Sequence, residues 1–119
     1  MGDLSEHFEC NEFACKCGCG FRRVDGRLIE ALEALRRVFD RPIHVTSGCR
    51  CAPHNRSIGG AAGSQHTVGR AADIQIPGVS PQTVGWVARA VVPEFRGIKV
   101  YSTWTHLDVR QGAAWLQGF

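Results

Sequence analysis

The sequence predicts an α+β domain in which two helices pack on one face of a small antiparallel sheet. Two observations predict this class. Apolar residues recur at helical spacing in two segments, and short runs of β-branched and aliphatic residues lie between and after them. The predicted elements follow the order helix, strand, long loop, strand, helix and hairpin, which is typical of α+β folds. With 119 residues, the chain is long enough for one domain with a real core.

Both predicted helices begin at capping residues and end before prolines. Asp25 is the expected N-cap of the first helix, which stops before Pro42. Ser80 and Pro81 give the second helix a cap and a proline at its first position, and this helix continues up to Pro93. The apolar stripes expected to face the core are Leu28, Ala31, Leu32, Leu35, Val38 and Phe39 in the first helix and Val84, Val87, Ala88 and Val91 in the second.

Four short strands complete the predicted fold. Residues 43–46 and 71–76 are each expected to form one strand, and residues 97–101 and 105–109 are expected to form a hairpin. Between the first two strands, residues 47–65 are rich in Gly, Pro, Asn and Ser and predict a long irregular loop. Such loops are uncommon in a compact domain unless they are functional.

Residues 1–24 are predicted to form an irregular arm that is rich in cysteine. The six cysteines of the chain are Cys10, Cys15, Cys17, Cys19, Cys49 and Cys51. An even number in a small chain suggests disulfides in an oxidising compartment. Because cysteines at a spacing of two rarely bond to each other, any bridges are expected to join the arm to Cys49 and Cys51. A second metal site and free thiols are the alternatives, and the connectivity stays open.

Charge and hydropathy disfavour two classes of partner. The net charge is only +3, and the arginines are scattered with few aromatic residues between them, so a nucleic-acid interface is not expected. No apolar run approaches the roughly 20 residues of a membrane span, so membrane insertion is not expected either. The first seven residues are polar and lack the apolar core of a signal peptide.

Two distant segments supply two histidines and a carboxylate. Residues 64–73, Ser-Gln-His-Thr-Val-Gly-Arg-Ala-Ala-Asp, contain His66 and Asp73, and His106 lies in the last predicted strand. A turn at Gly69 would bring the imidazole back over the start of the strand. The carboxylate lies among apolar neighbours and needs a partner when buried; this is a cation or, alternatively, a nearby arginine or a capping amide. Two imidazoles and one carboxylate bind Zn²⁺ and leave a fourth position open for water, which favours metal-assisted hydrolysis.

These segments resemble the signature of the zinc D-alanyl-D-alanine carboxypeptidase family, in its small phage-associated branch. That family includes dipeptidases and endolysins that cut peptidoglycan stem peptides, and hedgehog signalling domains share its zinc fold. The resemblance covers about residues 7–110. It is carried by Ser64-x-His66-x-x-Gly69-x-Ala71-x-Asp73, Ile43–Arg50 with its Ser-Gly-x-Arg ending, Cys51-x-x-His54-Asn55, Gly59-Gly60, Phe13–Gly20, and Tyr101–Arg110 with His106-x-Asp108.

The resemblance implies a function and a set of ligands. His66, Asp73 and His106 would bind Zn²⁺, and Arg50 would bind a substrate carboxylate or the developing oxyanion. The implied reaction is hydrolysis of a D-Ala–D-Ala or an L-Ala–D-Glu bond in peptidoglycan. The substrate would lie in the cell wall or periplasm, the route there stays open, and the protein is expected to act as a monomer.

Three further residues are candidates for substrate binding. Ser64 and Gln65 are expected to line the cleft or to orient His66, with ordinary loop hydrogen bonds as the alternative. His54 lies in the same turn-rich loop and could contact substrate. His44 and His54 are also less favoured candidates for the general base.

The sequence departs from the resembling family at the general base. Catalytic members usually carry Glu or Asp about three residues before the last histidine ligand, where this chain has Thr103, and others carry histidine where it has Trp104. Asp108, on the same strand face as His106, is the remaining candidate for the base. It could equally hold His106 by its other ring nitrogen. A non-catalytic zinc module that binds cell wall or protein is therefore the alternative to a peptidase.

Overall fold

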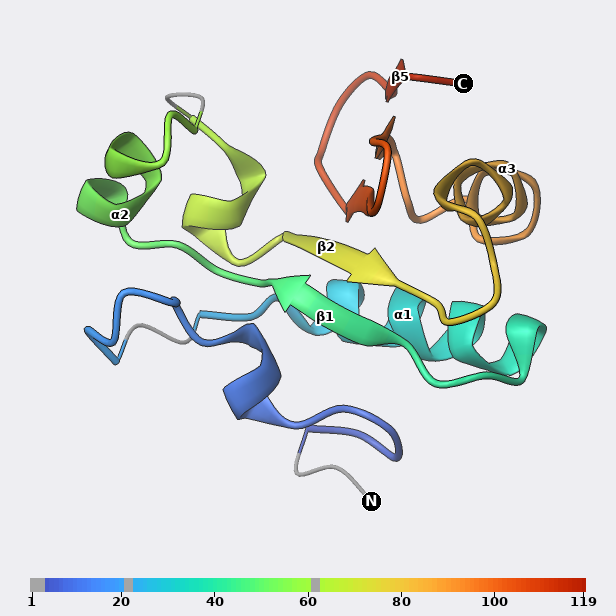
Figure 1. The fold of residues 1–119 in the computed structure, drawn as a ribbon, viewed down its shortest axis with the longest axis horizontal. Helices are drawn as coiled ribbons and strands as arrows, with labels where there is room; N and C mark the ends of the chain where they lie inside the picture. Colours follow the sequence, from blue (N-terminus) through green and yellow to red (C-terminus); the bar gives the residue numbers. More distant parts are fainter. Residues whose placement is uncertain (1–3, 21–22, 61–62) are drawn as a thin grey trace.

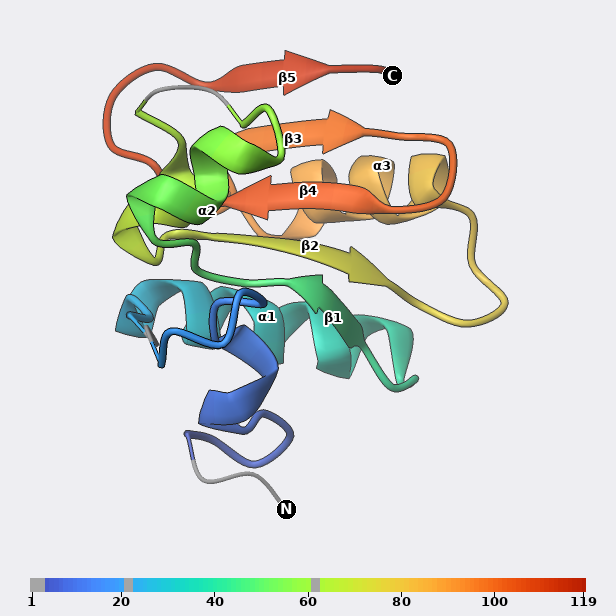
Figure 2. The same cartoon turned by 60° about the vertical axis from the view of Figure 1, so that its left-hand side comes forward.

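Five strands form one sheet, in the order β1-β2-β4-β3-β5, in the computed structural model, which describes residues 4–20, 23–60 and 63–119. The strands are β1 (His44–Ser47), β2 (Ala71–Gln75), β3 (Gly97–Val100), β4 (Thr105–Asp108) and β5 (Trp115–Gln117). The first four pair antiparallel, whereas β5 runs parallel to β3 (Figure 2). The predicted α+β class and the mostly antiparallel sheet are confirmed. The sequence did not predict β5.

The two longer helices, α1 (Gly26–Phe39) and α3 (Pro81–Val91), cover one face of the sheet (Figures 1 and 2). Each begins at its predicted cap, because the side chains of Asp25 and Ser80 accept backbone N–H bonds from the first turn. None of the helices in the described part of the chain is long and apolar enough to span a membrane.

The core lies between these two helices and the sheet. Its fully buried members include Leu28, Leu32, Leu35, Val84, Ile98 and Leu107. Two residues of the predicted stripes are not part of it: Val38 and Val91 are each 51% exposed. Both lie in the last turn of their helices, so each apolar stripe ends before its helix does.

Two phenylalanines of the cysteine-rich arm, Phe8 and Phe13, are part of the core, which the sequence did not predict. Phe8 and Phe13 are 1% and 0% exposed, and burial of each phenyl ring is worth about 1.5–3 kcal/mol. Phe13 ends the short helix η1 (Cys10–Phe13), which packs against β1. Its carbonyl accepts hydrogen bonds from both the backbone N–H (2.8 Å) and the thiol (2.9 Å) of Cys49. The arm is therefore fixed to the sheet.

The loop predicted at residues 47–65 contains a short helix, so the prediction of an irregular segment was wrong for part of it. This helix, α2 (Ala52–Ser57), begins after Cys51 and has a proline in its first turn. With the 3₁₀ helix η2 (Gln65–Val68), it lies at one end of the sheet, on the face opposite α1 and α3 (Figure 2). This end of the sheet holds the candidate site.

Candidate metal centre

Strands β2 and β4 place two of the predicted ligands side by side. Asp73 on β2 is directly opposite His106 on β4 in the antiparallel register. Their neighbours Ala72, Ile74 and Leu107 alternate to the other face and are buried in the core. The two polar side chains therefore lie on the face away from α1 and α3, as the alternation predicts.

The turn at Gly69 brings in the third predicted ligand. Gly69 ends η2 with φ of 70°, in the left-handed region that favours glycine. The carbonyl of Arg23 also occupies the position that a Cβ would need at Gly69. The chain changes direction at Gly69, so that η2 lies next to the start of β2. Nε2 of His66 then lies 3.2 Å from Oδ1 of Asp73. The predicted turn is confirmed.

Three ligand atoms converge at this point. Nδ1 of His106 lies 3.1 Å from Oδ1 of Asp73, and one ligand atom from each of the three side chains lies within 4.8 Å of the other two. Tetrahedral Zn²⁺ with bonds of about 2.0–2.1 Å separates its ligand atoms by about 3.4 Å. All three side chains are buried. The group could therefore hold one metal ion.

In each histidine, the ring nitrogen that points away from Asp73 has a hydrogen-bond partner, and this partner determines which nitrogen carries the proton. Nδ1 of His66 lies against the carbonyl of Gly48 (2.5 Å), which can only accept a hydrogen bond, so this nitrogen carries the proton. Nε2 of His106 lies 2.8 Å from Oδ2 of Asp108 and donates to that carboxylate. If both imidazoles are neutral, the nitrogens that face Asp73, Nε2 of His66 and Nδ1 of His106, each carry a lone pair. Two lone pairs and the Asp73 oxygen face one point, an arrangement that requires a cation.

Neighbouring groups in the site stabilise the charged forms of Asp73 and His106. Burial raises the pKa of Asp73, but its interactions with the imidazoles of His106 and His66 outweigh burial and hold that pKa well below its usual range. Burial lowers the pKa of His106, whereas its bonds to Asp108 and Asp73 raise it above the ordinary value overall. In the absence of a metal, protonation of His106 could supply the cation that these acceptors require.

Asp108 lies on the outer side of His106 and is fully buried. Arg110 donates from Nε to Oδ1 (2.8 Å) and from Nη2 to Oδ2 (2.7 Å) of this carboxylate. Burial raises the pKa of Asp108, but the bonds from Arg110 and His106 lower it to about 2. Both oxygens are thus engaged away from the three ligand atoms. The geometry favours the orienting role of Asp108 over the role of general base.

Arg50 forms hydrogen bonds to two residues of the same centre, Asp73 and His66. Its guanidinium donates to Oδ2 of Asp73 (3.3 Å) and to Oδ1 of Asn55 (3.2 Å). Its backbone N–H donates to the carbonyl of His66 (3.0 Å). Arg50 therefore shares a carboxylate with the candidate metal ligands while its guanidinium lines the adjacent cleft.

A cleft of about 500 Å³ opens beside the three ligand atoms. Ser64 and Gln65 are among its lining residues, together with Arg50. The hydroxyl of Ser64 also accepts the backbone N–H of His66 and so caps η2. His54 lies on α2 and is not among the lining residues, so the structure does not bring it to the site.

The cleft also contains side chains that sequence reasoning missed. These are Lys99, Tyr101, Arg110 and Trp115. Lys99 is directly opposite His106 in the β3–β4 register, so the predicted hairpin contained the signal for it. Trp115 comes from β5, and its ring centroid lies 5.7 Å from that of His106. No pattern in the sequence indicated that contact.

Thr103, Trp104 and His44, also considered as positions for a general base, lie outside the cleft. Thr103 and Trp104 are between β3 and β4 and do not line the cleft, and His44 is exposed on β1. Among the described residues that line the cleft, Asp73 is the only carboxylate. The site therefore combines three candidate metal ligands with no second carboxylate among the described residues that line the cleft.

Comparison with known proteins agrees with this geometry. A family model described as Peptidase M15 matches residues 6–108, which include most of the arm, all three candidate ligands and Asp108. None of the curated proteins matches the chain.

Proposed function

The chain belongs to the peptidase M15 family, and from this membership we propose that it is a zinc-dependent peptidase that hydrolyses peptidoglycan stem peptides. The observation that carries the proposal is the buried group of His66, Asp73 and His106 beside a cleft. Bound Zn²⁺ would polarise the scissile carbonyl and lower the pKa of a water molecule.

The surrounding residues hold the ligands in place for this chemistry. The carbonyl of Gly48 and the carboxylate of Asp108 each accept from the outer nitrogen of one histidine, which fixes the tautomer and the ring orientation. Arg110 in turn fixes Asp108. This arrangement directs the unprotonated ring nitrogens of both histidines toward Asp73.

The charges of the cleft favour an anionic peptide. Three cationic side chains line it: Arg50, Lys99 and Arg110. A terminal D-Ala carries a carboxylate next to the scissile bond, and so does a D-Glu that is linked through its side chain. Arginine and lysine at the cleft suit both substrates, and Arg50 is best placed because it already lies beside Asp73. Tyr101 and Trp115 supply apolar surface for the peptide methyl groups.

One observation favours a second candidate function. Because Asp73 is the only carboxylate among the described cleft residues and is also a candidate ligand, the cleft offers no separate acid to act as general base. This favours a module that binds zinc and cell-wall peptides without cutting them.

Incubation of the zinc-loaded protein with purified muropeptides, followed by mass spectrometry, tests the proposal. We expect stem peptides shortened at one bond, and no products from a His106→Ala control that retains its fold by circular dichroism. Binding of muropeptides without cleavage would contradict the peptidase and support the binding module. The masses of the products identify which bond is cut.

A further inference from the structure

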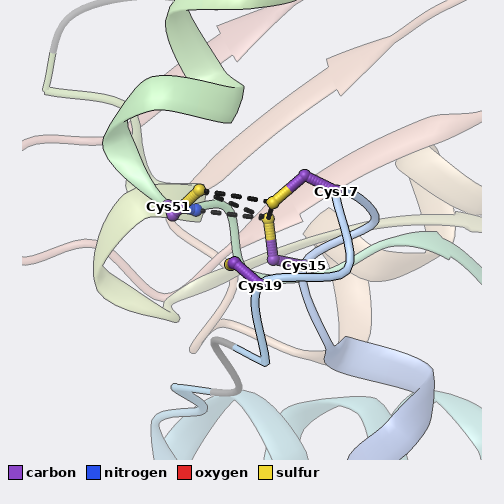
Figure 3. A group of neighbouring side chains, drawn as sticks. All are labelled: Cys15, Cys17, Cys19 and Cys51. Carbon is purple, nitrogen blue, oxygen red and sulfur yellow. Dashed lines mark hydrogen bonds between the residues drawn. The ribbon is translucent and has the colours of Figure 1, made fainter.

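Four cysteines that are separated in the sequence meet on the surface next to α2. Cys15, Cys17 and Cys19 come from the arm, and Cys51 is the residue before α2 (Figure 3). Their four Sγ atoms all lie within 4.8 Å of one another, and none of these cysteines forms a disulfide. None of them takes part in the centre of His66, Asp73 and His106.

The distances among three of these sulfurs fit ligands of one tetrahedral metal ion. Sγ of Cys15 lies 3.4 Å from that of Cys17 and 3.7 Å from that of Cys51, and Cys17 lies 3.6 Å from Cys51. Zn–S bonds of about 2.3 Å in a tetrahedron place the sulfurs about 3.8 Å apart, whereas a disulfide needs about 2.05 Å. A pair of disulfides also does not explain why the sulfurs of Cys15, Cys17 and Cys51 lie at similar distances from one another.

We propose that Cys15, Cys17, Cys19 and Cys51 bind a second, structural Zn²⁺ through four thiolates. Four protein ligands close the coordination sphere, so this ion has no open position and takes no part in hydrolysis. A tetrahedral set of four sulfurs suits zinc or an iron–sulfur centre. All four sulfurs lie within 4.8 Å of one another, a spacing that suits thiolates on one ion better than thiolates divided between several metal atoms.

The backbone around the cluster supports thiolate ligands. The N–H of Cys51 donates to Sγ of Cys15 (3.4 Å), and a hydrogen bond of this kind stabilises the charged form of the sulfur. Cys17 and Cys19 are exposed, so metal could reach the site from solvent.

The position of Cys51 gives the ion a role in the fold of the cleft. Cys51 directly follows Arg50, whose backbone donates to His66 and whose side chain donates to Asp73. A metal that joins Cys51 to the arm therefore fixes the chain on the far side of Arg50. The second zinc would stabilise the wall of the cleft that presents this guanidinium.

Metal analysis of the reduced protein tests this proposal. We expect about two zinc ions per chain in the wild type and about one in a Cys17→Ser, Cys19→Ser double variant. The matched control is Cys10→Ser, which lies outside the cluster and keeps both ions. His106→Ala also keeps about one ion, which identifies the cysteine site whether or not the protein is a peptidase. A wild type with one ion that His106→Ala loses and the double variant keeps would overturn the proposal, as would two ions in the double variant.

Two measurements on the wild type avoid any folding defect of the variants. Cobalt substitution is expected to give the intense near-ultraviolet thiolate-to-cobalt absorption of a sulfur-rich site. The four cluster thiols are expected to become reactive toward a thiol reagent only after a chelator is added. Absence of the cobalt band, or immediate reaction of all exposed thiols in the metal-loaded protein, would contradict a thiolate site. A disulfide that joins the arm to Cys51 in the metal-loaded protein, found by peptide mapping, would contradict it as well.

Discussion

At the scale of single residues, the role of Asp108 distinguishes a carboxylate that orients His106 from a general base. Its carboxylate bonds to the outer nitrogen of His106 and to Arg110, and it does not face the ligand atoms. In Asp108→Asn we expect zinc affinity to fall about 10–100-fold, because the amide no longer holds a charge-assisted bond to the imidazole. Competition with a fluorescent chelator measures this. Unchanged zinc affinity with abolished cleavage would instead identify Asp108 as the general base.

Glu33 gives a second prediction at this scale, away from both candidate metal sites. Its buried carboxylate accepts from the hydroxyl of Ser5 (2.5 Å) and from the backbone N–H of His7 (2.7 Å), and so joins α1 to the arm. Burial raises its pKa, but the bonds from Ser5 and His7 lower it below the ordinary 4.5. Because the folded pKa is the lower one, the carboxylate contributes stability above pH 4.5 and loses it as the pH falls through the folded pKa.

Urea unfolding at a series of pH values tests this contribution. Glu33→Gln is expected to cost about 1–3 kcal/mol at pH 7, and the difference from the wild type should shrink in acid. Glu30→Gln, at an exposed position of the same helix, is the control and should change little. An identical pH dependence for the wild type and Glu33→Gln would contradict the prediction.

At the scale of elements, the β3–β4 hairpin depends on a residue without a side chain. Gly97 is directly opposite Asp108, and the Asp108 carboxylate occupies the position where a Cβ of residue 97 would lie. We expect Gly97→Ala to displace this carboxylate, to cost about 1–3 kcal/mol of stability and to weaken zinc binding. Thermal unfolding and zinc titration measure both. Gly26→Ala, where a Cβ meets no neighbour, is the control; equal effects in the two variants would contradict the argument.

At the scale of the whole molecule, metal removal is expected to lower stability. An ion that binds only the folded chain stabilises it by about 2.7 kcal/mol when its concentration is 100 times Kd. A chelator should therefore lower Tm in the wild type, and the shift should be smaller in His106→Ala, which has one fewer site. Calorimetry with and without chelator makes this comparison. A Tm that does not respond to the chelator would exclude metal from the folded state.

Local patterns in the sequence predicted some features of the whole molecule and missed others. Asp25 and Ser80 marked the starts of α1 and α3, and alternation around Asp73 placed it on the correct face, because caps and strand periods are local. The elements α2 and β5 were missed because six and three residues are too short to show a period. Lys99 and Trp115 reach the cleft through strand register and a parallel pairing, which only the assembled sheet determines.

The carboxylate of Asp73 is shared by two neighbours of different kinds. Oδ1 faces the two imidazoles, and Oδ2 accepts from Arg50. A cation at Oδ1 draws charge from Oδ2 and weakens its hold on the guanidinium, which leaves Arg50 freer to bind a substrate anion. Thermodynamic linkage then requires the converse. If Arg50 binds the substrate anion as proposed, an anion that draws Arg50 away from Asp73 would tighten metal binding by the same factor, and metal and substrate would favour each other through the Asp73 side chain.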